Sequence, residues 1–290
     1  MKNNTVVVLI NYYSSDLIIE AVNIFSEMPF DIFIIDNSCN YNEQILLGNI
    51  AEKIKNVRII INSDNLGFGG ALSKFTETHD NYNSYTFVNP DITGIKTEMF
   101  EKRLEIFLNS NNCFFQPVII DNLRKEKSIQ GLKNAKPINI FFEYTLFKYF
   151  FKRRVLKAEN ITNGIQELFV PSGAFFTIKK SSLLLIGGFP KKTFLYFEEW
   201  LIASRISKQR NSSIGYVDSN IIVKHAVGGS TKLKFGISTK KMSLIRLKSF
   251  LKVVDENFKH TFLVKSLIYI DFFMRSIVSQ ILKIYVKFKR

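Results

Sequence analysis

The chain has 290 residues, of which 46% are apolar, and it carries a formal net charge of +15 at pH 7. This length and apolar content predict a globular protein with one large domain or two small ones, and they exclude a chain too small or too polar to form a core. Its two cysteines, Cys39 and Cys113, belong to no CxxC or Cys/His cluster, so neither a disulfide framework nor a structural zinc site is expected, and a reducing cytoplasm is favoured.

The first apolar run, Thr5 to Ile10, is too short for the core of a signal peptide and indicates a buried strand. No segment approaches the roughly 20 uncharged residues that a membrane-spanning helix requires. We therefore expect a protein that is soluble or bound to a membrane surface.

Short β-branched runs alternate with amphipathic segments over the first hundred residues. Strands are expected at 5–10, 30–36, 57–61 and 85–90, with helices at 15–28, 43–54 and 68–79. This order predicts an α/β fold with a mostly parallel central sheet flanked by helices. Ligands bind beyond the carboxyl ends of such strands, where the sequence places INYYSS, DNSCN and NPD.

Residues 121–165 interrupt the alternation with a basic, aromatic-rich insertion that is compatible with a buried helix, a mobile lid or a membrane-facing hairpin. The regular pattern then resumes. A strand leading into a helix is expected within 168–189, a helix within 193–210 and a further strand at 214–225.

Three glycines, Gly67, Gly69 and Gly70, lie between the third strand and the next helix in the segment NSDNLGFGGALS. Glycines at such a position permit tight turns and close approach of a ligand to the backbone, and a helix N-terminus favours an anion. The spacing matches neither a dinucleotide-binding fingerprint nor a phosphate-binding P-loop. Close packing of the helix explains the glycines as well as phosphate binding does.

Two adjacent carboxylates, Glu198 and Glu199, follow an aromatic run in FLYFEEW. Neighbours on a helix point about 100° apart, so at most one of the two is expected to be catalytic. A carboxylate between Phe197 and Trp200 would be partly desolvated, which raises its pKa toward the range of a general base. The alternative is an N-terminal helix carboxylate that the helix dipole stabilises.

A polar strand end and a lone histidine supply the other candidates. The strand at 85–90 leads into Asn89, Pro90 and Asp91, which is also an ordinary turn sequence. His225 ends an apolar strand, and a lone histidine is more often structural than a ligand. An Asp/His pair together with water and a diphosphate suits Mn²⁺ or Mg²⁺.

The order of these motifs resembles the family 2 glycosyltransferases with the GT-A fold, a Rossmann-like α/β fold, and most closely the rhamnosyltransferase-like branch of bacterial surface-polysaccharide enzymes. The resemblance rests on seven segments that occur in the expected order up to residue 231: INYYSS, IIDNSC, NLGFGGAL, VNPDI, VPSGAFFTIKKSSLLLIGGF, LYFEE and HAVGGS. No specific motif covers the chain beyond that point.

The resemblance implies a division of the chain into two parts. A catalytic domain at 1–231 would comprise a nucleotide-binding half (1–120), the insertion (121–165) and an acceptor half (166–231). A basic helical region would follow at 232–290.

The resemblance also implies roles for single residues in the nucleotide-binding half. Asn11 and Asp36 would line the pocket for the nucleotide base, and Asn65, Gly67 and Asn89 would contribute to binding of the sugar donor.

Further roles concern the chemistry itself. Asp91 would bind the donor by holding a divalent metal, Mn²⁺ or Mg²⁺, on its diphosphate, and His225 would complete the metal site. Glu199 would be the general base, and Glu198 the first acid of the catalytic pair. The backbone at Gly173 would form the floor under the donor sugar and the acceptor.

The implied activity is inverting, metal-dependent transfer of a sugar from a nucleoside-diphosphate sugar, dTDP-rhamnose or a UDP-hexose, to a hydroxyl of a glycan or lipid-linked glycan in surface polysaccharide biosynthesis. The sequence departs from the family pattern at several positions. Asn89 replaces one carboxylate of the DXD element, Glu199 stands where Asp is commoner, and Trp200 and Leu201 replace a small residue and an Asp. These departures bear on the identity of donor and acceptor more than on the reaction class.

The C-terminal part of the chain is strongly basic, with 14 Lys and Arg against three acids from residue 232 to 290. An apolar stripe at helical spacing accompanies the charge: Leu244, Leu247, Leu251, Val254 and Phe258. Such basic amphipathic helices would hold a cytoplasmic protein on the inner face of the cell membrane, or they would pack on the catalytic domain or in a homo-oligomer.

Two other functions are compatible with parts of the sequence. The basic tail also suits a nucleic-acid-binding protein, but no RRM, zinc-finger or helix-turn-helix signature is present, so nucleic acid is not the expected partner. A nucleotidyltransferase on the same fold would usually carry a basic glycine-rich loop after the first strand, and INYYSSD contains no Gly, Lys or Arg.

Overall fold

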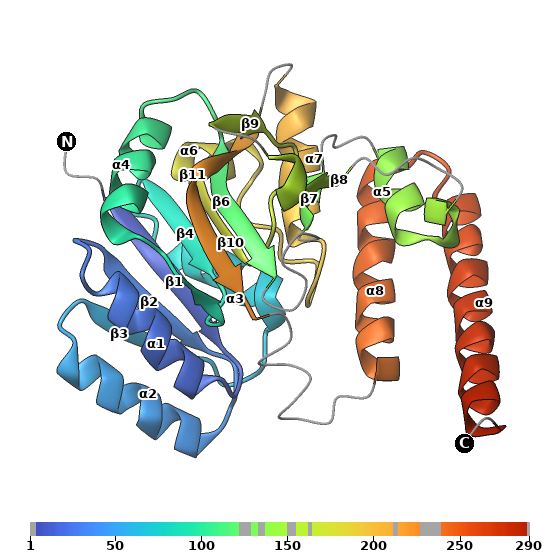
Figure 1. Ribbon diagram of the computed structural model, residues 1–290, viewed down its shortest axis with the longest axis horizontal. Coiled ribbons are helices and arrows are strands. Elements are labelled where there is room, and N and C mark those ends of the chain that lie inside the picture. The colour runs from blue at the N-terminus through green and yellow to red at the C-terminus, as the bar shows by residue number, and fades with distance from the viewer. Residues whose placement is uncertain are drawn as a thin grey trace.

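The computed structural model describes residues 4–121, 129–132, 137–149, 155–161, 164–210, 214–226 and 239–288. Within these ranges a nine-stranded sheet has helices on both faces, and the helices α8 (Thr239–Asn257) and α9 (Thr261–Phe288) stand side by side at one edge of the molecule (Figure 1). The expected α/β architecture is therefore confirmed.

The first half of the sheet follows the predicted alternation. Its strands are parallel neighbours in the order β3-β2-β1-β4, with bounds β1 (Thr5–Asn11), β2 (Asp31–Asp36), β3 (Val57–Ile61) and β4 (Ser84–Val88). The connecting helices are α1 (Ser15–Phe25), α2 (Tyr41–Lys53) and α3 (Gly67–Thr78). Every strand and helix expected in this half is present, with small shifts at its ends.

The second half adds a strand of opposite direction. The sheet continues in the order β4-β10-β6-β11-β5, and β10 lies antiparallel between β4 and β6. The main elements are α4 (Thr97–Leu108), β6 (Phe114–Asp121), β10 (Phe175–Lys179), α6 (Lys180–Leu185), α7 (Glu198–Gln209) and β11 (Gly215–His225). The short strands β5 (Ile92–Thr93) and β9 (Ile165–Glu167) pair antiparallel with β11. Because β6 and β11 run parallel to the first four strands, the sheet is mostly parallel, as predicted.

The two faces of the sheet form two apolar cores. In β1, Val6 and Val8 pack on one face with residues of α3, α7 and α8, whereas Val7 and Leu9 pack on the other with residues of α1, α2 and α4. This alternation follows from the two-residue period of a strand. Burial of each such side chain stabilises the fold by about 1.5–3 kcal/mol, so the strand ends that carry polar residues are held in place from both sides.

The described residues of the insertion pack against the rest of the protein. The insertion contains a two-stranded sheet of β7 (Ile129–Leu132) and β8 (Val155–Lys157), the helix α5 (Pro137–Tyr144), and the short turns Leu146–Tyr149 and Ala158–Asn160. Ile140 and Phe141 are buried, and the ring of Tyr144 packs edge-on against Phe197. A membrane-facing hairpin is therefore wrong for these residues, whereas Phe150 and Phe151 lie outside the described residues.

The helix α8 packs its apolar stripe against the protein. Leu247 and Val254 are buried in the core, and of the predicted stripe only Leu244 is exposed. Arg205 of α7 makes two hydrogen bonds to Glu256 of α8, at 3.0 and 2.8 Å, which fix the two helices together. The expectation that this stripe faces a membrane is wrong, because burying it in the core removes it from any lipid surface.

Two further observations concern the C-terminal region. The expected domain boundary at 231/232 lies outside the described residues. No helix in the described part of the chain has the length and apolar character needed to cross a bilayer.

Candidate active site

A pocket of 490 Å³ opens at the carboxyl edge of the sheet. Asn89 directly follows β4 and His225 ends β11, and because β10 runs in the opposite direction, the residues that precede it lie at the same edge. The turn before α7, the end of α5, one residue each of α3 and α8, and residues of β7 and β8 form the rest of the wall. The residues that line it include Phe68, Asn89, Tyr144, Ser172, Gly173, Tyr196, Phe197, Glu198, Glu199, Trp200, His225 and Arg246.

Asp91 and His225 meet although 134 positions separate them in the sequence. The antiparallel pairing of β5 with β11 sets Ile92 opposite His225, which brings His225 beside the preceding Asp91. His225 Nε2 lies 3.1 Å from Asp91 Oδ1 and 3.5 Å from Asn89 Nδ2. Only 5% of the Asp91 side chain and 17% of the His225 side chain are exposed. The two predicted metal ligands therefore form one partly buried pair.

The separation of these two atoms suits neighbouring ligands of one divalent ion. Ligands about 2.1 Å from a metal and at right angles to each other lie about 3.0 Å apart. The described residues contain no group of three or more His, Cys, Asp or Glu that could hold a metal. A diphosphate and water would have to complete the coordination, and the mixed carboxylate–imidazole donor set suits Mn²⁺ better than Mg²⁺, which prefers oxygen ligands.

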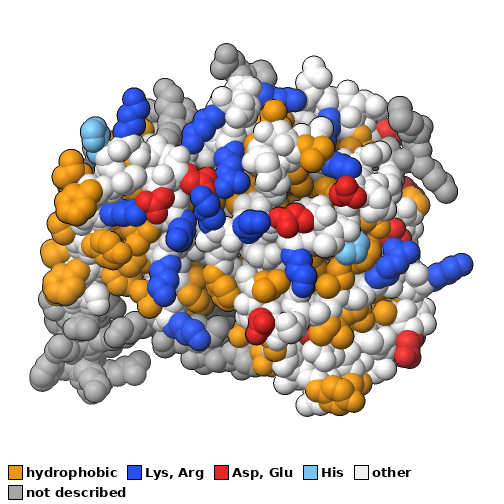
Figure 2. Space-filling model, turned by 180° about the vertical axis from the view of Figure 1, so that it is seen from behind, with side chains coloured by type: hydrophobic (Ala, Val, Ile, Leu, Met, Phe, Trp, Pro, Cys, Tyr) orange, Lys and Arg blue, Asp and Glu red, His pale blue; other side chains and the backbone are white. Residues whose placement is uncertain are grey.

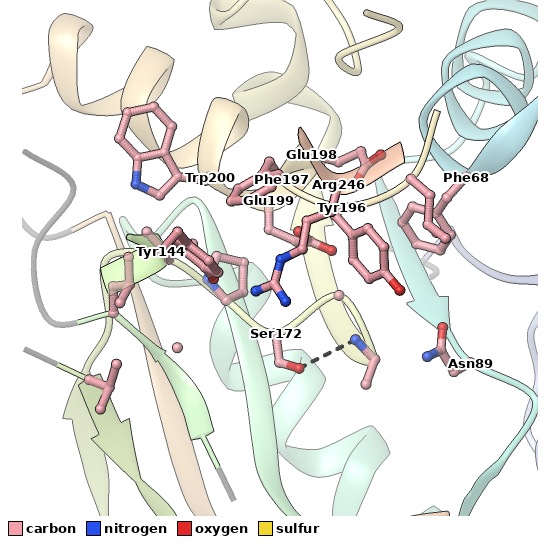
Figure 3. Close-up of a pocket in the computed structure, with 18 of the residues that line it drawn as sticks. Phe68, Asn89, Tyr144, Ser172, Tyr196, Phe197, Glu198, Glu199, Trp200 and Arg246 are labelled. Carbon is pink, nitrogen blue, oxygen red and sulfur yellow. Dashed lines mark hydrogen bonds between the residues drawn. The ribbon is translucent and has the colours of Figure 1, made fainter. Parts of the chain in front are cut away.

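Glu198 and Glu199 begin α7 after a strained turn. Tyr196 and Phe197 have φ angles of 77° and 74°, in the left-handed region that non-glycine residues rarely adopt. Two such residues in a row cost on the order of 1–3 kcal/mol each and persist only where packing enforces them. In Figure 3 the two carboxylates diverge, and Glu199 points into the space that Tyr196 and Arg246 also face.

Both carboxyl groups have raised pKa values. Burial raises the pKa of Glu198, although hydrogen bonds from the backbone and from the side chain of Thr193 lower it in part. Burial also raises the pKa of Glu199, and repulsion from the charge of Glu198 adds to the rise. A carboxylate in this state holds a proton more tightly than usual, which is the property a general base needs.

Gly173 forms the floor beneath the Glu199 carboxylate. A Cβ atom at Gly173 would lie 1.6 Å from Glu199 Oε1, which is far too close for two atoms that are not bonded. Any larger residue would force the Glu199 side chain to move, so glycine lets the backbone approach the carboxylate where it lies. The predicted floor residue and the predicted base are thus in direct contact.

The variant Gly173→Ala is expected to lower activity about 100-fold, because the added methyl group displaces Glu199 from the pocket floor and a displacement of about 1 Å can cost that much. Rates of sugar transfer measure the effect. The matched control is Gly48→Ala on α2, where an added Cβ meets nothing within 4 Å. Unchanged activity in Gly173→Ala would contradict the placement of Glu199.

Asn11 and Asp36 lie at the ends of β1 and β2, as predicted, and their polar atoms are engaged within the protein. Asn11 Nδ2 donates to Asp36 Oδ1 at 2.9 Å and to Glu43 Oε2 at 3.0 Å. The backbone amide and the hydroxyl of Ser38 donate to the two Asp36 oxygens, each at 3.0 Å. Both predicted residues are fully buried, so the observed contacts join two loops, and contact with a nucleotide base stays a prediction.

The glycine-rich loop packs against the segment that precedes the turn before α7. The amide of Phe68 donates to the carbonyl of Phe194 at 2.7 Å, and a Cβ at Gly67 would lie 2.1 Å from that carbonyl oxygen. Asn65 Oδ1 accepts a hydrogen bond from the amide of Gly67 at 2.9 Å. Close packing thus accounts for Gly67, and donor binding by Asn65 and Gly67 stays a prediction.

Sequence reasoning missed several pocket residues. Arg246 of α8 lies over the rings of Tyr144 and Tyr196, with its guanidinium carbon 5.0 and 5.8 Å from their centroids. Ser172 accepts from the amide of Ala174 at 3.4 Å (Figure 3). The aromatic run that contains Tyr144 was a signal in the sequence, whereas nothing marked Arg246 among the many basic residues of the tail.

No family model and no curated protein sequence matches the chain. Solved structures do match. The mannosyltransferase PcManGT from Pyrobaculum calidifontis, in complex with GDP-Man and Mn²⁺, matches with a TM-score of 0.56 and 11% identity over 87% of this chain and 63% of that one. GalNAc-T7 with UDP, GalNAc and Mn²⁺ matches with a TM-score of 0.53 and 12% identity over 77% of this chain and 43% of that one.

A third similar structure is S. aureus TarS 1-349, with a TM-score of 0.54 and 11% identity over 90% of this chain and 69% of that one. The chain spans less than two thirds of the length of PcManGT and of GalNAc-T7. At these identities the likeness shows the fold, which is the GT-A fold of glycosyltransferases, as the sequence predicted. It does not distinguish the rhamnosyltransferase-like branch from other glycosyltransferases.

Proposed function

We propose that the protein is an inverting, metal-dependent glycosyltransferase that uses a nucleoside-diphosphate sugar as donor and a hydroxyl group as acceptor. One observation carries the proposal. A single pocket joins Asn89 and His225, with Asp91 beside them, to the carboxylate of Glu199 on the floor formed by Gly173. The end of the pocket near Asp91 and His225 suits a metal-bound diphosphate. The end at Glu199 suits removal of a proton from the acceptor hydroxyl.

The proposed mechanism is a single displacement. A divalent metal bound by Asp91 and His225 would neutralise the charge that develops on the departing diphosphate. The carboxylate of Glu199 accepts the proton of the acceptor hydroxyl as its oxygen forms a bond to the anomeric carbon. The bond from that carbon to the diphosphate oxygen breaks from the opposite face, so the configuration inverts and the nucleoside diphosphate leaves with the bonding electron pair.

The donor and the acceptor are proposed as chemical classes. The donor is dTDP-rhamnose or a UDP-hexose, and GDP-mannose joins them because a similar structure binds GDP-Man and others bind UDP. The acceptor is a hydroxyl of a glycan or lipid-linked glycan, which suits a pocket lined by aromatic rings together with polar and charged side chains. The setting is surface polysaccharide biosynthesis in the cytoplasm of a bacterium, at the inner face of its membrane.

The activity is expected to fall on acidification at a pH well above the ordinary carboxyl pKa of 4.5. Burial and the neighbouring Glu198 raise the pKa of Glu199, so protonation removes the base before an exposed carboxyl group would titrate. A pH profile of kcat/KM at saturating Mn²⁺ measures this limb, with a slope of about tenfold per pH unit. A rate that is constant down to the ordinary carboxyl range would contradict Glu199 as the base.

Incubation of the purified chain with a panel of nucleoside-diphosphate sugars and Mn²⁺ tests the proposal. The expected result is release of one nucleoside diphosphate, dependent on the metal and stimulated by a glycan or lipid-linked acceptor. Release of pyrophosphate from a nucleoside triphosphate and a sugar phosphate would instead identify a nucleotidyltransferase. Absence of turnover with every donor and acceptor would contradict the proposal.

A further inference from the structure

Between residues 261 and 278 the helix α9 turns its charged residues toward the protein. Lys265 Nζ lies 2.5 Å from Asp255 of α8. Asp271 accepts a hydrogen bond from the backbone amide of Leu146 at 2.5 Å and lies 2.9 Å from Arg275 Nε. Amphipathic helices of globular proteins usually show the reverse arrangement, with charges outward.

The opposite side of α9 is apolar and exposed. At 100° per residue its large side chains between 262 and 278 cover roughly 180° of the helix circumference, and within this part of the helix the arc contains no charged residue. Its one polar member, Ser266, donates its hydroxyl to the carbonyl of Phe262 within the helix. This apolar face of α9 consists of Phe262, Leu263, Leu267, Tyr269, Ile270, Phe273, Met274, Ile277 and Val278, which are between 36% and 80% exposed.

Nine neighbouring exposed apolar side chains form a patch rather than the scattered single residues that water-exposed surfaces normally carry. Figure 2 shows hydrophobic side chains gathered at the edge of the molecule where α9 lies, with Lys and Arg side chains beside them. The adjacent helix α8 and the turn after it contribute exposed basic residues: Lys241, Lys248, Lys252 and Lys259.

We propose that the apolar face of α9 is a docking surface for a lipid bilayer with an anionic leaflet. The inference deepens the proposed setting at a membrane by naming the surface that binds it, and it does not depend on the sugar-transfer activity. The helix would lie in the interface with its apolar arc among the acyl chains, while the neighbouring basic residues contact anionic headgroups.

Two features favour a bilayer over a second copy of the chain. Helix pairs bury a narrow stripe of each partner, whereas an arc of half the circumference matches a continuous apolar phase. Two copies would also bring basic surfaces together, and each chain carries a net charge of +15. An anionic leaflet supplies the opposite charge to the same surface.

The docking surface is connected to the pocket through the end of α5. Arg275 Nη2 donates to the carbonyl of Tyr144 at 3.0 Å. The ring of Tyr144 lies 4.7 Å from that of Phe197, between centroids, in the pocket wall. If the proposed function holds, this arrangement sets the pocket beside the bilayer, where a lipid-linked acceptor is available.

Vesicle flotation with the full chain tests the proposal. The vesicles are phosphatidylcholine mixed with phosphatidylglycerol, and phosphatidylcholine alone. The test variant combines Phe262→Ser, Ile270→Ser and Phe273→Ser on the apolar face of α9. The matched control combines Ile45→Ser, Ile61→Ser and Leu184→Ser, which removes three exposed apolar side chains elsewhere. Circular dichroism and Tm verify that each variant is folded.

The expected result is that the wild type and the control bind the anionic vesicles, more weakly when phosphatidylglycerol is left out, and that the α9 variant binds at least tenfold more weakly. Failure of the folded wild type to bind the anionic vesicles would overturn the proposal. Equal binding by the α9 variant and the wild type would also overturn it. A dimer in sedimentation that dissociates in the α9 variant, without vesicle binding, would assign the face to a second copy. None of these results depends on sugar transfer, so failure of this inference is separate from failure of the proposed function.

Discussion

Glu199→Gln is expected to lower the rate of sugar transfer about 1,000-fold, within the range of 10²–10⁴ that a general base contributes. Glutamine fills the same space over Gly173 but cannot accept the proton of the acceptor. Binding of the donor nucleotide is expected to be unchanged, because the metal ligands lie elsewhere in the pocket. Rates of nucleoside diphosphate release and calorimetric titration of the nucleotide measure the two effects separately.

The same variant is expected to be more stable than the wild type at pH 8. The pKa of Glu199 is raised in the folded protein, so the folded state binds the proton more tightly than the unfolded state does. Stability therefore declines as the pH rises above the unfolded pKa, and removing the carboxyl group abolishes this loss. Tm at pH 8 and at pH 5 measures the effect, which should be larger at pH 8.

Glu167→Gln on the exposed strand β9 is the matched control, and neither its activity nor its Tm should change. A Glu199→Gln variant that is folded and retains full transfer activity would contradict the assignment of the base. A Tm that is lowered at pH 8 would contradict the burial of an uncompensated carboxylate.

Asp91→Asn is expected to weaken Mn²⁺ binding at least 100-fold in the presence of the nucleoside diphosphate. Loss of a residue that only supports a metal ligand already lowers metal affinity 10–100-fold, and Asp91 is proposed as a ligand itself. Asparagine keeps the size of the side chain beside His225 but removes the charge that binds the cation. Electron paramagnetic resonance of free Mn²⁺ measures the binding, and sugar transfer should fall in parallel.

Asp80→Asn, in an exposed position after α3, is the control for Asp91→Asn and should bind the metal as the wild type does. His225→Ala is expected to weaken binding as well, because the two side chains contact each other at 3.1 Å. Wild-type affinity for Mn²⁺ in Asp91→Asn would exclude this pair as the metal site.

Much of the first half of the sheet was predictable because its signals are local. The strand and helix periods of the first hundred residues correspond to β1 to β4 and the helices between them. The place of Asp91 beyond a strand end followed from the same pattern. That β10 is inserted antiparallel between β4 and β6 was not predictable, because strand order depends on long-range packing that leaves no local period.

The remaining features of the site depend on contacts between distant segments. The pairing of β5 with β11 joins Asp91 to His225, and the packing of α8 on α7 places Arg246 in the pocket. The glycines between β3 and α3 were compatible with an anion site in the sequence. In the structure, Gly67 leaves room for the carbonyl group of Phe194, which a larger side chain would displace. The charge of the tail drew attention to its basic residues. Between residues 262 and 278, however, the exposed side of α9 is apolar, because the charged side chains of this part pair inward.

Titration calorimetry of the wild-type chain with UDP, GDP and dTDP, each with and without Mn²⁺, tests the central claim most directly. The pocket and the Asp91–His225 pair predict that at least one of the three binds, and that removing Mn²⁺ weakens this binding at least tenfold. The preferred base would then narrow the choice of donor sugar. Folded protein that binds none of the three nucleotides, with or without the metal, would contradict a donor site at this edge of the sheet.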